Sequence, residues 1–288
     1  MMKRLPLKGL HALALSGMLL VSSSLHADSE NPAPGNLPED NATVADSVLR
    51  IPGNIKMIGD YAFSDRDDFC NVIVEEGIEK IGEYAFLGCG NLREISLPQS
   101  LVEIGEGAFR ECGKLRRLDM PDGLKALPRY LCAWDTSLQK VRLPERLEDI
   151  SSHCFAYCKS LKDVNLPESL LHIGSNAFSD CRSLKSIKVP DSVTELESYA
   201  FSGCSHLKEA TLPANDHMLG EFIFTGCDDL KSIKVMSEVP PPFDCYSPPF
   251  DPSEKIRKDC RLIVPRGAEE SYRNAPGWNF FTNINVAL

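Results

Sequence analysis

Phenylalanine recurs along this chain at a constant interval of 23 residues, or of 46 where one position is skipped. The repeating residues are Phe63, Phe86, Phe109, Phe155, Phe178, Phe201 and Phe224, and Cys132 occupies the skipped position. A fixed period of about 20 to 50 residues is typical of a solenoid, in which each unit forms one coil that packs only on its neighbours. The period therefore predicts one stack of about eight coils. It also places function on a surface rather than in a catalytic pocket.

Each unit contains a short apolar strand pattern followed by a turn. The clearest unit spans residues 81–103, in which Ile95 and Leu97 alternate with polar residues and the run stops at Pro98. This pattern predicts a strand and a turn, and a proline is tolerated at the end of a strand. The Ala-Phe-x-x-Cys segment predicts a short helical or 3₁₀ turn. Stacked units then give a β-rich α/β solenoid with a parallel strand ladder on one face, turns and loops on the other, and capped ends.

The first 43 residues differ from the repeats. Residues 1–27 combine early positive charges, an apolar run over residues 10–21 and a small-residue cleavage site before Asp28. This order predicts a Sec-type export signal, so that the mature protein is periplasmic, displayed at the cell surface or secreted. A transmembrane anchor is the alternative, but the run is shorter than the about 20 residues that span a bilayer. Residues 28–43 are polar and proline-rich, which predicts a flexible leader.

The repeats occupy residues 44–236, and residues 237–288 follow with a different rhythm. This tail contains a proline-rich loop, one more strand pattern and a short helical pattern. Trp278, Phe280 and Phe281 then form an apolar group, which we expect to cover the open end of the core because a solenoid needs caps. An aromatic binding site is the alternative for these residues.

The charge of the chain limits its partners. Removing residues 1–27 lowers Lys+Arg from 31 to 28 against 41 acidic residues, so the net charge changes from −10 to −13. An acidic protein of this kind is a poor generic ligand for nucleic acid or an anionic membrane.

Six of the eleven cysteines form one column, each lying three residues after the repeated Phe position. They are Cys89, Cys112, Cys158, Cys181, Cys204 and Cys227. Neighbouring strands lie about 4.8 Å apart, and parallel side chains keep the Cβ atoms at that distance, beyond the about 3.8 Å of a disulfide. We therefore expect buried, reduced thiols; disulfides and a metal site are the alternatives, although paired Cys-x-x-Cys spacing is missing. Cys245 and Cys260 lie outside the column and are better candidates for a disulfide.

The whole unit is specific enough to suggest a family. The pattern Leu-x-x-Ile-x-Leu-Pro-x-x-Leu-x-x-Ile-Gly-x-x-Ala-Phe-x-x-Cys resembles the leucine-rich repeat of BspA-type surface proteins over roughly residues 48–265. Residues 262–278 resemble the terminal module common in that family. The resemblance implies a leucine-rich repeat solenoid and an exported bacterial protein that binds other macromolecules, as in adhesion. It implies no catalytic residues.

The sequence offers little for catalysis. It contains no glycine-rich phosphate loop, no His-Glu-x-x-His and no paired-cysteine motif. The best candidate ion site is a column in which His172 lies between Asp149 and Glu195, with a surface charge ladder as the alternative. Catalysis needs irregular, pre-organised pockets, whereas stacking accounts for almost every position. We expect a non-enzymatic, adhesion-type scaffold without cofactor or metal. The alternatives are a structural spacer of an envelope assembly and, less favoured, a carbohydrate- or peptide-active enzyme subunit.

One column on the strand face is basic. It comprises Arg93, Arg116, Gln139, Lys162, Lys185, Lys208 and Lys231. A second column, just past the strand proline, comprises Gln99, Asp122, Glu145, Glu168 and Asp191. Either the two columns neutralise each other and keep the sheet soluble, or the basic column recognises an acidic protein or an anionic glycan. No aromatic residues interleave the basic column, so single-stranded nucleic acid is not the expected partner.

The fourth unit departs from the pattern. Asp135 replaces the column cysteine, and the register brings together four rings on two adjacent coils. The rings belong to Tyr130, Trp134, His153 and Tyr157. The departure is either drift or a second binding surface, because exposed aromatic patches mark partner sites. We expect a monomer that binds a protein or glycan through the basic column, the ring cluster or both.

Overall fold

The computed structural model describes residues 42–215, 217, 219–242, 250 and 259–287. The expected signal peptide, residues 28–41 of the expected leader, and Cys245 lie outside these ranges.

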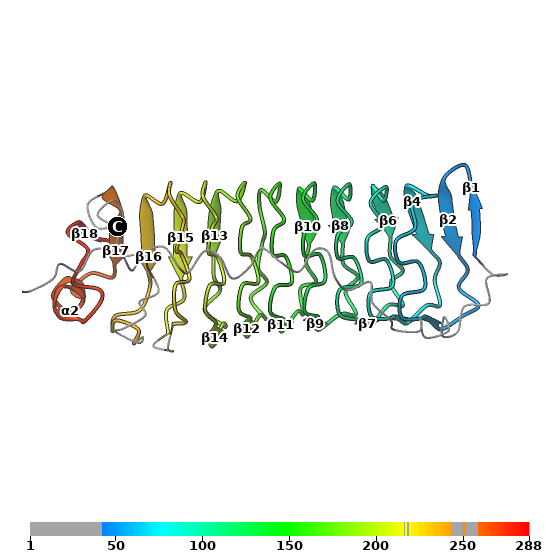
Figure 1. The fold of residues 1–288 in the computed structure, drawn as a ribbon. Helices are drawn as coiled ribbons and strands as arrows, with labels where there is room; N and C mark the ends of the chain where they lie inside the picture. The colour runs from blue at the N-terminus through cyan, green and yellow to red at the C-terminus, as the bar shows by residue number, and fades with distance from the viewer. Residues whose placement is uncertain (1–41, 216, 218, 243–249, 251–258, 288) are drawn as a thin grey trace, which may run out of the picture. The chain divides into compact units, whose positions relative to one another are not determined.

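The described chain is a β-solenoid of about 10 stacked turns with almost no helix (Figure 1). Its main ladder runs in the order β2 (Val48–Ile51), β4 (Asn71–Val74), β6 (Glu94–Ser96), β8 (Arg117–Asp119), β10 (Lys140–Arg142), β13 (Ser186–Lys188), β15 (Glu209–Leu212), β16 (Ser232–Val235), β17 (Arg261–Val264) and β18 (Ile284–Val286). Asp163 occupies the rung between β10 and β13 and forms a single bridge to Lys140. The pairings are parallel and in register, as in Lys140↔Arg117 and Glu209↔Ser232. The leucine-rich repeat solenoid is therefore confirmed.

The stack contains more turns than the phenylalanine count predicts. Counting Phe residues misses the rung at β2, and it misses β17 and β18, which continue the ladder in parallel beyond the last repeat. Coil-to-coil pairing needs only the strand segment, so a coil without the repeated Phe can still join the ladder.

A second ladder of two-residue strands runs along another side of each coil. It comprises β3 (Met57–Ile58), β5 (Lys80–Ile81), β7 (Glu103–Ile104), β9 (Ala126–Leu127), β11 (Asp149–Ile150), β12 (His172–Ile173) and β14 (Glu195–Leu196). The described strands pair as β3-β5-β7 and as β9-β11-β12-β14. The sequence indicates only an inward-facing apolar pair at these positions, because a two-residue strand is too short to show a period.

The Phe-containing segments form hydrogen-bonded turns with local bonds such as Leu87 N to Tyr84 O at 3.0 Å, in agreement with the short helical or 3₁₀ turn expected from the sequence. Each turn is held by backbone bonds to the next coil, such as Phe86 N to Ala108 O at 2.8 Å. The one named helix of the described residues is α2 (Glu269–Asn274), in the tail. The main ladder, the second ladder and these turns form the three sides of each coil, which we call the strand face, the second-ladder face and the turn face.

The core is a column of stacked phenylalanines. Phe155, Phe178 and Phe201 are fully buried, and successive ring centroids lie 5.3 and 5.4 Å apart. Beside this column, Cys181 Sγ donates to Phe155 O at 3.2 Å, and the other five column cysteines make the same bond to the coil before them. All six are buried, as expected, and all six are free thiols in this structure. Cysteine recurs here because its thiol satisfies a buried carbonyl while filling a small apolar space.

Both ends of the ladder are covered. At the first end, β1 (Thr43–Ala45) pairs antiparallel with β2. At the other end, Phe250 continues the Phe column 6.1 Å from Phe224 and meets Trp278 at 5.1 Å. Trp278 is 1% exposed and its Nε1 donates to Pro241 O at 3.0 Å. The indole of Trp278 therefore closes the end of the core and does not line a binding site. Cys260 is buried with a free thiol.

Candidate binding surface

The basic column lies at the start of the strand face, one residue before each strand of the main ladder. Backbone bonds set the spacing of its members. Lys208 N donates to Lys185 O at 2.8 Å, and Lys231 N donates to Lys208 O at 2.9 Å. Every member of the column is exposed. A β-type ladder therefore holds these side chains in one straight row at about 4.8 Å per rung.

The cations of this column form no ion pair with any residue that the structure describes. The acidic column that follows the strand prolines is engaged elsewhere. Asp122 pairs with Arg142 at 2.8 Å, and Glu168 pairs with Lys188 at 3.0 Å, both of which are cations of the strands themselves. The two columns named in the sequence therefore do not neutralise each other. Two of the acids are paired with strand cations, and the basic column remains open to an external anion.

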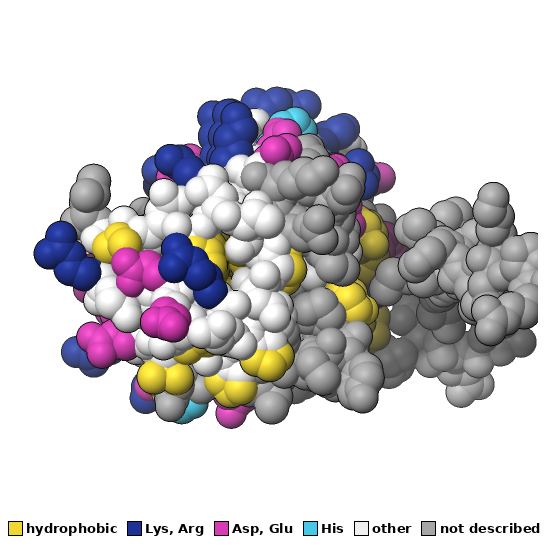
Figure 2. Space-filling view, turned by 90° about the vertical axis from the view of Figure 1, so that its left-hand side faces the viewer, with side chains coloured by type: hydrophobic (Ala, Val, Ile, Leu, Met, Phe, Trp, Pro, Cys, Tyr) yellow, Lys and Arg dark blue, Asp and Glu magenta, His cyan; other side chains and the backbone are white. Residues whose placement is uncertain are grey.

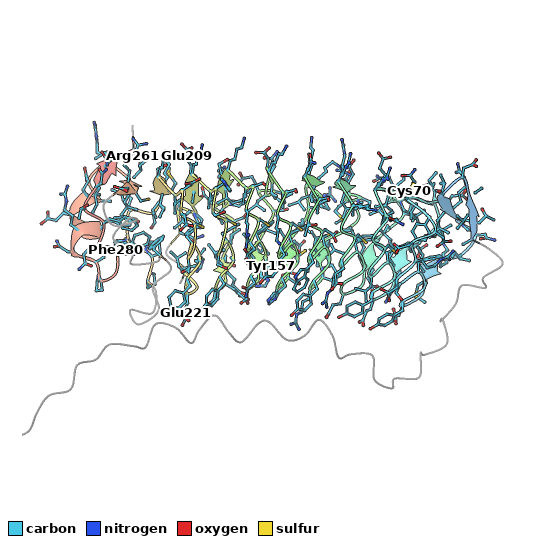
Figure 3. The ribbon with its side chains drawn as sticks, turned by 45° about the horizontal axis from the view of Figure 1, so that its top comes forward. Cys70, Tyr157, Glu209, Glu221, Arg261 and Phe280 are labelled. Carbon is cyan, nitrogen blue, oxygen red and sulfur yellow. The ribbon has the colours of Figure 1, made fainter. Side chains whose placement is uncertain are left out.

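The strand face around this column is polar. Outward positions of the strands carry charged or hydroxyl side chains, such as Glu94, Lys140 and Glu209, and none of the exposed large hydrophobic residues lies on β6 to β16. Viewed along the stack, Lys and Arg side chains gather at the upper edge of the molecule (Figure 2). Glu209 and Arg261, the first residues of β15 and β17, lie along this upper edge in Figure 3.

The four rings predicted from the fourth unit do come together, on the turn face. Trp134 stacks on Tyr157 at 5.1 Å with an angle of 8°, and Tyr130 lies 4.8 Å from His153. Two arginines that the sequence interpretation missed complete the cluster. Arg110 lies 4.8 Å above the Trp134 ring, and Arg129 lies 5.4 Å above the Tyr130 ring.

This arrangement limits what the cluster can bind. Trp134 is sandwiched between Arg110 and Tyr157, so both faces of its indole are occupied and its edge is presented. His153 is half-buried; burial and then nearby Arg129 lower the pKa of its ring, which is neutral at pH 7. Arg110 also pairs with Glu111 at 3.1 Å, so the cluster is an aromatic-edged patch that contains both charges. Figure 3 shows Tyr157 on the lower side, away from the edge that carries Glu209, so the ring cluster and the basic column occupy different faces.

The turn face has an unusual backbone in every coil. Tyr130, Trp134, His153 and Tyr157 all have positive φ, between 56° and 67°. Some corresponding positions in other coils carry glycine, as at Gly107 with φ 60°, and others carry a bulky residue, as at Tyr84 with φ 53°. Positive φ disfavours bulky residues, so the scattered glycines were the signal in the sequence that these registers are turns.

The histidine column is a closed network on three coils. The register of His172 between Asp149 and Glu195 is correct, but the ring bonds Glu197 in place of Glu195. Nδ1 bonds Asp149, and Nε2 lies 3.1 Å from Glu197 Oε1. Burial opposes protonation, but the two carboxylate bonds outweigh it and raise the pKa of His172. Both ring nitrogens are occupied, and among the described residues no group of three or more His, Cys, Asp or Glu side chains is placed to hold a metal ion.

In the cysteine column of the described repeats, Asp135 is the one position where a carboxyl group replaces the thiol. It lies inside the core, between the thiols of the two neighbouring coils. It is fully buried, and neither carboxyl oxygen has a hydrogen-bond partner. Burial raises its pKa well above the usual value, so the carboxyl keeps its proton to a higher pH in the folded protein than in the unfolded chain. The group faces the core and takes no part in a surface.

Two hollows lie on the part of the surface that the structure describes. The larger, of about 420 Å³, is a shallow depression on the second-ladder face lined by Val102, Ala126 and Pro128 among others. The other, of about 250 Å³, lies near Cys70 and Arg93.

Fold and surface together describe a repeat scaffold that presents long side-chain columns. The model of the BspA type leucine rich repeat region, in 6 copies, matches residues 47–133 and 125–241. This chain therefore belongs to the BspA-type leucine-rich repeat family. Proteins of this family are typically non-enzymatic binding scaffolds and surface proteins. No helix of the described residues is long and apolar enough to cross a membrane.

Three solved structures are similar to this chain. A leucine-rich repeat protein from Bacteroides ovatus is 23% identical with a TM-score of 0.61, over 88% of this chain and 74% of that one. The Treponema pallidum leucine-rich repeat protein TpLRR is 22% identical with a TM-score of 0.46, over 82% and 94%. The pneumococcal vaccine antigen PcpA is 22% identical with a TM-score of 0.42, over 84% and 79%. No curated protein matches the chain. The likeness to the Bacteroides ovatus protein establishes the fold alone.

Proposed function

We propose that this chain is an exported bacterial scaffold without enzymatic activity, which binds a protein or glycan in the manner of an adhesin. The observation that carries the proposal is the basic column. Six exposed cations stand in one row with no ion pair to a described residue. An unpaired row of like charges is unfavourable on its own, since neighbouring cations repel each other, and an anionic partner relieves that repulsion.

The ring cluster supplies a second contact surface. Tyr, Trp and Arg are enriched where interfaces concentrate their binding energy, and here all three side-chain types meet within two to three coils. Since the cluster and the column lie on different faces, the proposal assigns them to separate contacts.

Export is supported by the pattern of residues 1–27 and by the family. A positive start, a short apolar run and a small-residue site precede Asp28. The proposed location is the periplasm, the cell surface or the medium.

Two measurements test the proposal. Expression with residues 1–27 in a bacterial host, followed by mass spectrometry of the exported protein, should find an N-terminus at Asp28. Retention of the uncleaved chain in the cytoplasm contradicts export.

Binding is tested with a variant that reverses Lys162, Lys185 and Lys208 to Glu. Exposed side chains without partners contribute little to folding, about 0–1 kcal/mol each, so the variant should fold normally. Partners that the wild type captures from envelope and host extracts through the basic column should be lost or weakened, and the salt dependence of their association rate should fall. Identical partners for both proteins would place binding on another surface, and capture of no partner by either protein would favour a structural spacer.

A further inference from the structure

The chemistry of the strand face selects one kind of partner. Resting on the proposed function, we infer that the basic column binds a linear polysaccharide that carries sulfate or carboxylate groups at regular intervals, with its chain lying along the stack.

The geometry of the column favours a long, regular polyanion. From Arg93 to Lys231 there are six register steps, which span about 29 Å at about 4.8 Å per step. The row is straight because parallel pairing holds each rung in register. A folded acidic protein presents its carboxylates irregularly, whereas a charged polysaccharide repeats them at a fixed interval along one line.

An extended acidic peptide fits less well. Side chains on one side of an extended peptide recur about every 6.7 Å, whereas the rungs are about 4.8 Å apart. The two spacings therefore fall out of register within two or three contacts. In a polysaccharide the distance between successive sugar rings is shorter, and it is similar to the spacing between two neighbouring rungs.

The surroundings of the column also disfavour a protein. Stable protein interfaces have an apolar or aromatic centre with charged residues at the rim. The strand face has no exposed large hydrophobic residue on β6 to β16, and its outward positions are charged or hydroxyl-bearing. Binding there depends on charge and hydrogen bonds, as sulfate and carboxylate groups require. Nucleic acid is disfavoured because no rings lie on this face for bases to stack on.

Gln139 divides the row and supplies a test. It separates Arg93 and Arg116 from the uninterrupted run Lys162 to Lys231. Its backbone N donates to Arg116 O at 2.9 Å, so its rung is in register, and its side chain is exposed. Substitution Gln139→Lys completes the row without touching the core.

The experiment measures binding of the purified protein to heparin oligosaccharides of defined length, and to hyaluronate, over a range of salt concentrations. The wild type should bind heparin with an affinity that rises with oligosaccharide length until the column is spanned, and hyaluronate binding then separates carboxylate from sulfate recognition. Gln139→Lys should tighten heparin binding several-fold and steepen the dependence of log Kd on log salt by about one unit.

Two triple variants with equal charge change provide the control. Lys162→Gln, Lys185→Gln and Lys208→Gln together should weaken binding at least tenfold and reduce the salt slope by about three. Lys56→Gln, Lys80→Gln and Lys125→Gln together remove the same charge from the second-ladder face, where each lysine pairs with a Glu. This control should change affinity less than twofold.

Three results overturn the inference. Equal loss in both triple variants would show that net charge acts without a site. Equal or tighter binding of poly-glutamate or single-stranded DNA would assign the column to another polymer. Absence of glycan binding, while a captured protein partner is lost in the Lys162/Lys185/Lys208 variant, would reject the polysaccharide and leave the proposed scaffold function in place.

Discussion

The buried carboxyl of Asp135 predicts that this protein can be stabilised by one substitution. In the other described coils from Cys89 to Cys227, a cysteine occupies the position of Asp135. Its thiol donates to a backbone carbonyl of the preceding coil, at 3.1–3.2 Å. Asp135 is fully buried and both of its oxygens lack a partner. Asp135→Cys restores the thiol at nearly constant volume and removes the unpaired polar group.

The magnitude follows from two effects. A buried polar group without a hydrogen bond costs about 1–3 kcal/mol, so the variant should be more stable by about that amount even at acid pH. The second effect depends on pH. Burial raises the pKa of Asp135 in the folded state above its ordinary value of 3.8. As pH rises above that value the unfolded chain releases its proton while the folded chain retains one, so the free energy of unfolding falls. The slope is at most about 1.4 kcal/mol per pH unit for one proton.

The assay is urea unfolding of wild type and Asp135→Cys between pH 4 and pH 8, with a reducing agent present. The stability difference should be smallest near pH 4 and should grow as pH rises towards the folded-state pKa. Asp135→Asn is the matched control, because it removes the titration and keeps an unpaired polar group; it should abolish the pH dependence attributed to Asp135. A difference between wild type and Asp135→Cys that is constant with pH, or a less stable Cys variant, would refute the reasoning.

Three further predictions test other parts of the structure. Phe178→Ala should lower the free energy of unfolding by about 3–5 kcal/mol, since its fully buried ring stacks on both neighbours; a loss below about 1 kcal/mol in urea unfolding would show that the ring is outside the core. A bulky thiol reagent should leave Cys181 and Cys204 unmodified in the native protein, because both are fully buried and burial raises the pKa of each thiol; rapid labelling seen by mass spectrometry, or a disulfide between them, would contradict this. His172→Asn should cost more stability at pH 5 than at pH 9, because the raised pKa of His172 gives stability that is full below its unfolded value of 6.5 and is lost as pH rises through the folded value; equal losses at both pH values would show that the imidazolium is not the stabilising form.

The repeating part of the fold is readable from the sequence because a fixed period determines which residues share a column. Register alone placed His172 beside Asp149 and brought Trp134 next to Tyr157, and both placements are correct. The same reasoning cannot choose between side chains that reach the same point from different positions. It selected Glu195 by register, whereas Glu197 reaches the His172 ring from two residues further along.

Conformation at the turns was harder to predict than register. The Ala-Phe-x-x-Cys segment predicts a short turn, and its turns do make local bonds, such as Cys89 N to Phe86 O at 3.3 Å; the further bonds to the next coil, such as Phe86 N to Ala108 O, cannot be predicted from the segment alone. Similarly, the match of Asp122 to Arg142 depends on side-chain direction across a turn, which no column count contains. Arg110 and Arg129 were missed because they are cationic residues in otherwise variable columns, and only the positions of the rings reveal their role.

The claim that the basic column is the binding surface is tested most directly by lysine footprinting. The protein is acetylated with and without a bound heparin oligosaccharide, and the modification of each lysine is measured by mass spectrometry. Binding along the column should protect Lys162, Lys185 and Lys208 and leave Lys56 and Lys125 on the second-ladder face unchanged. Protection of Lys56 and Lys125, with the column lysines as reactive as in the free protein, would contradict the account.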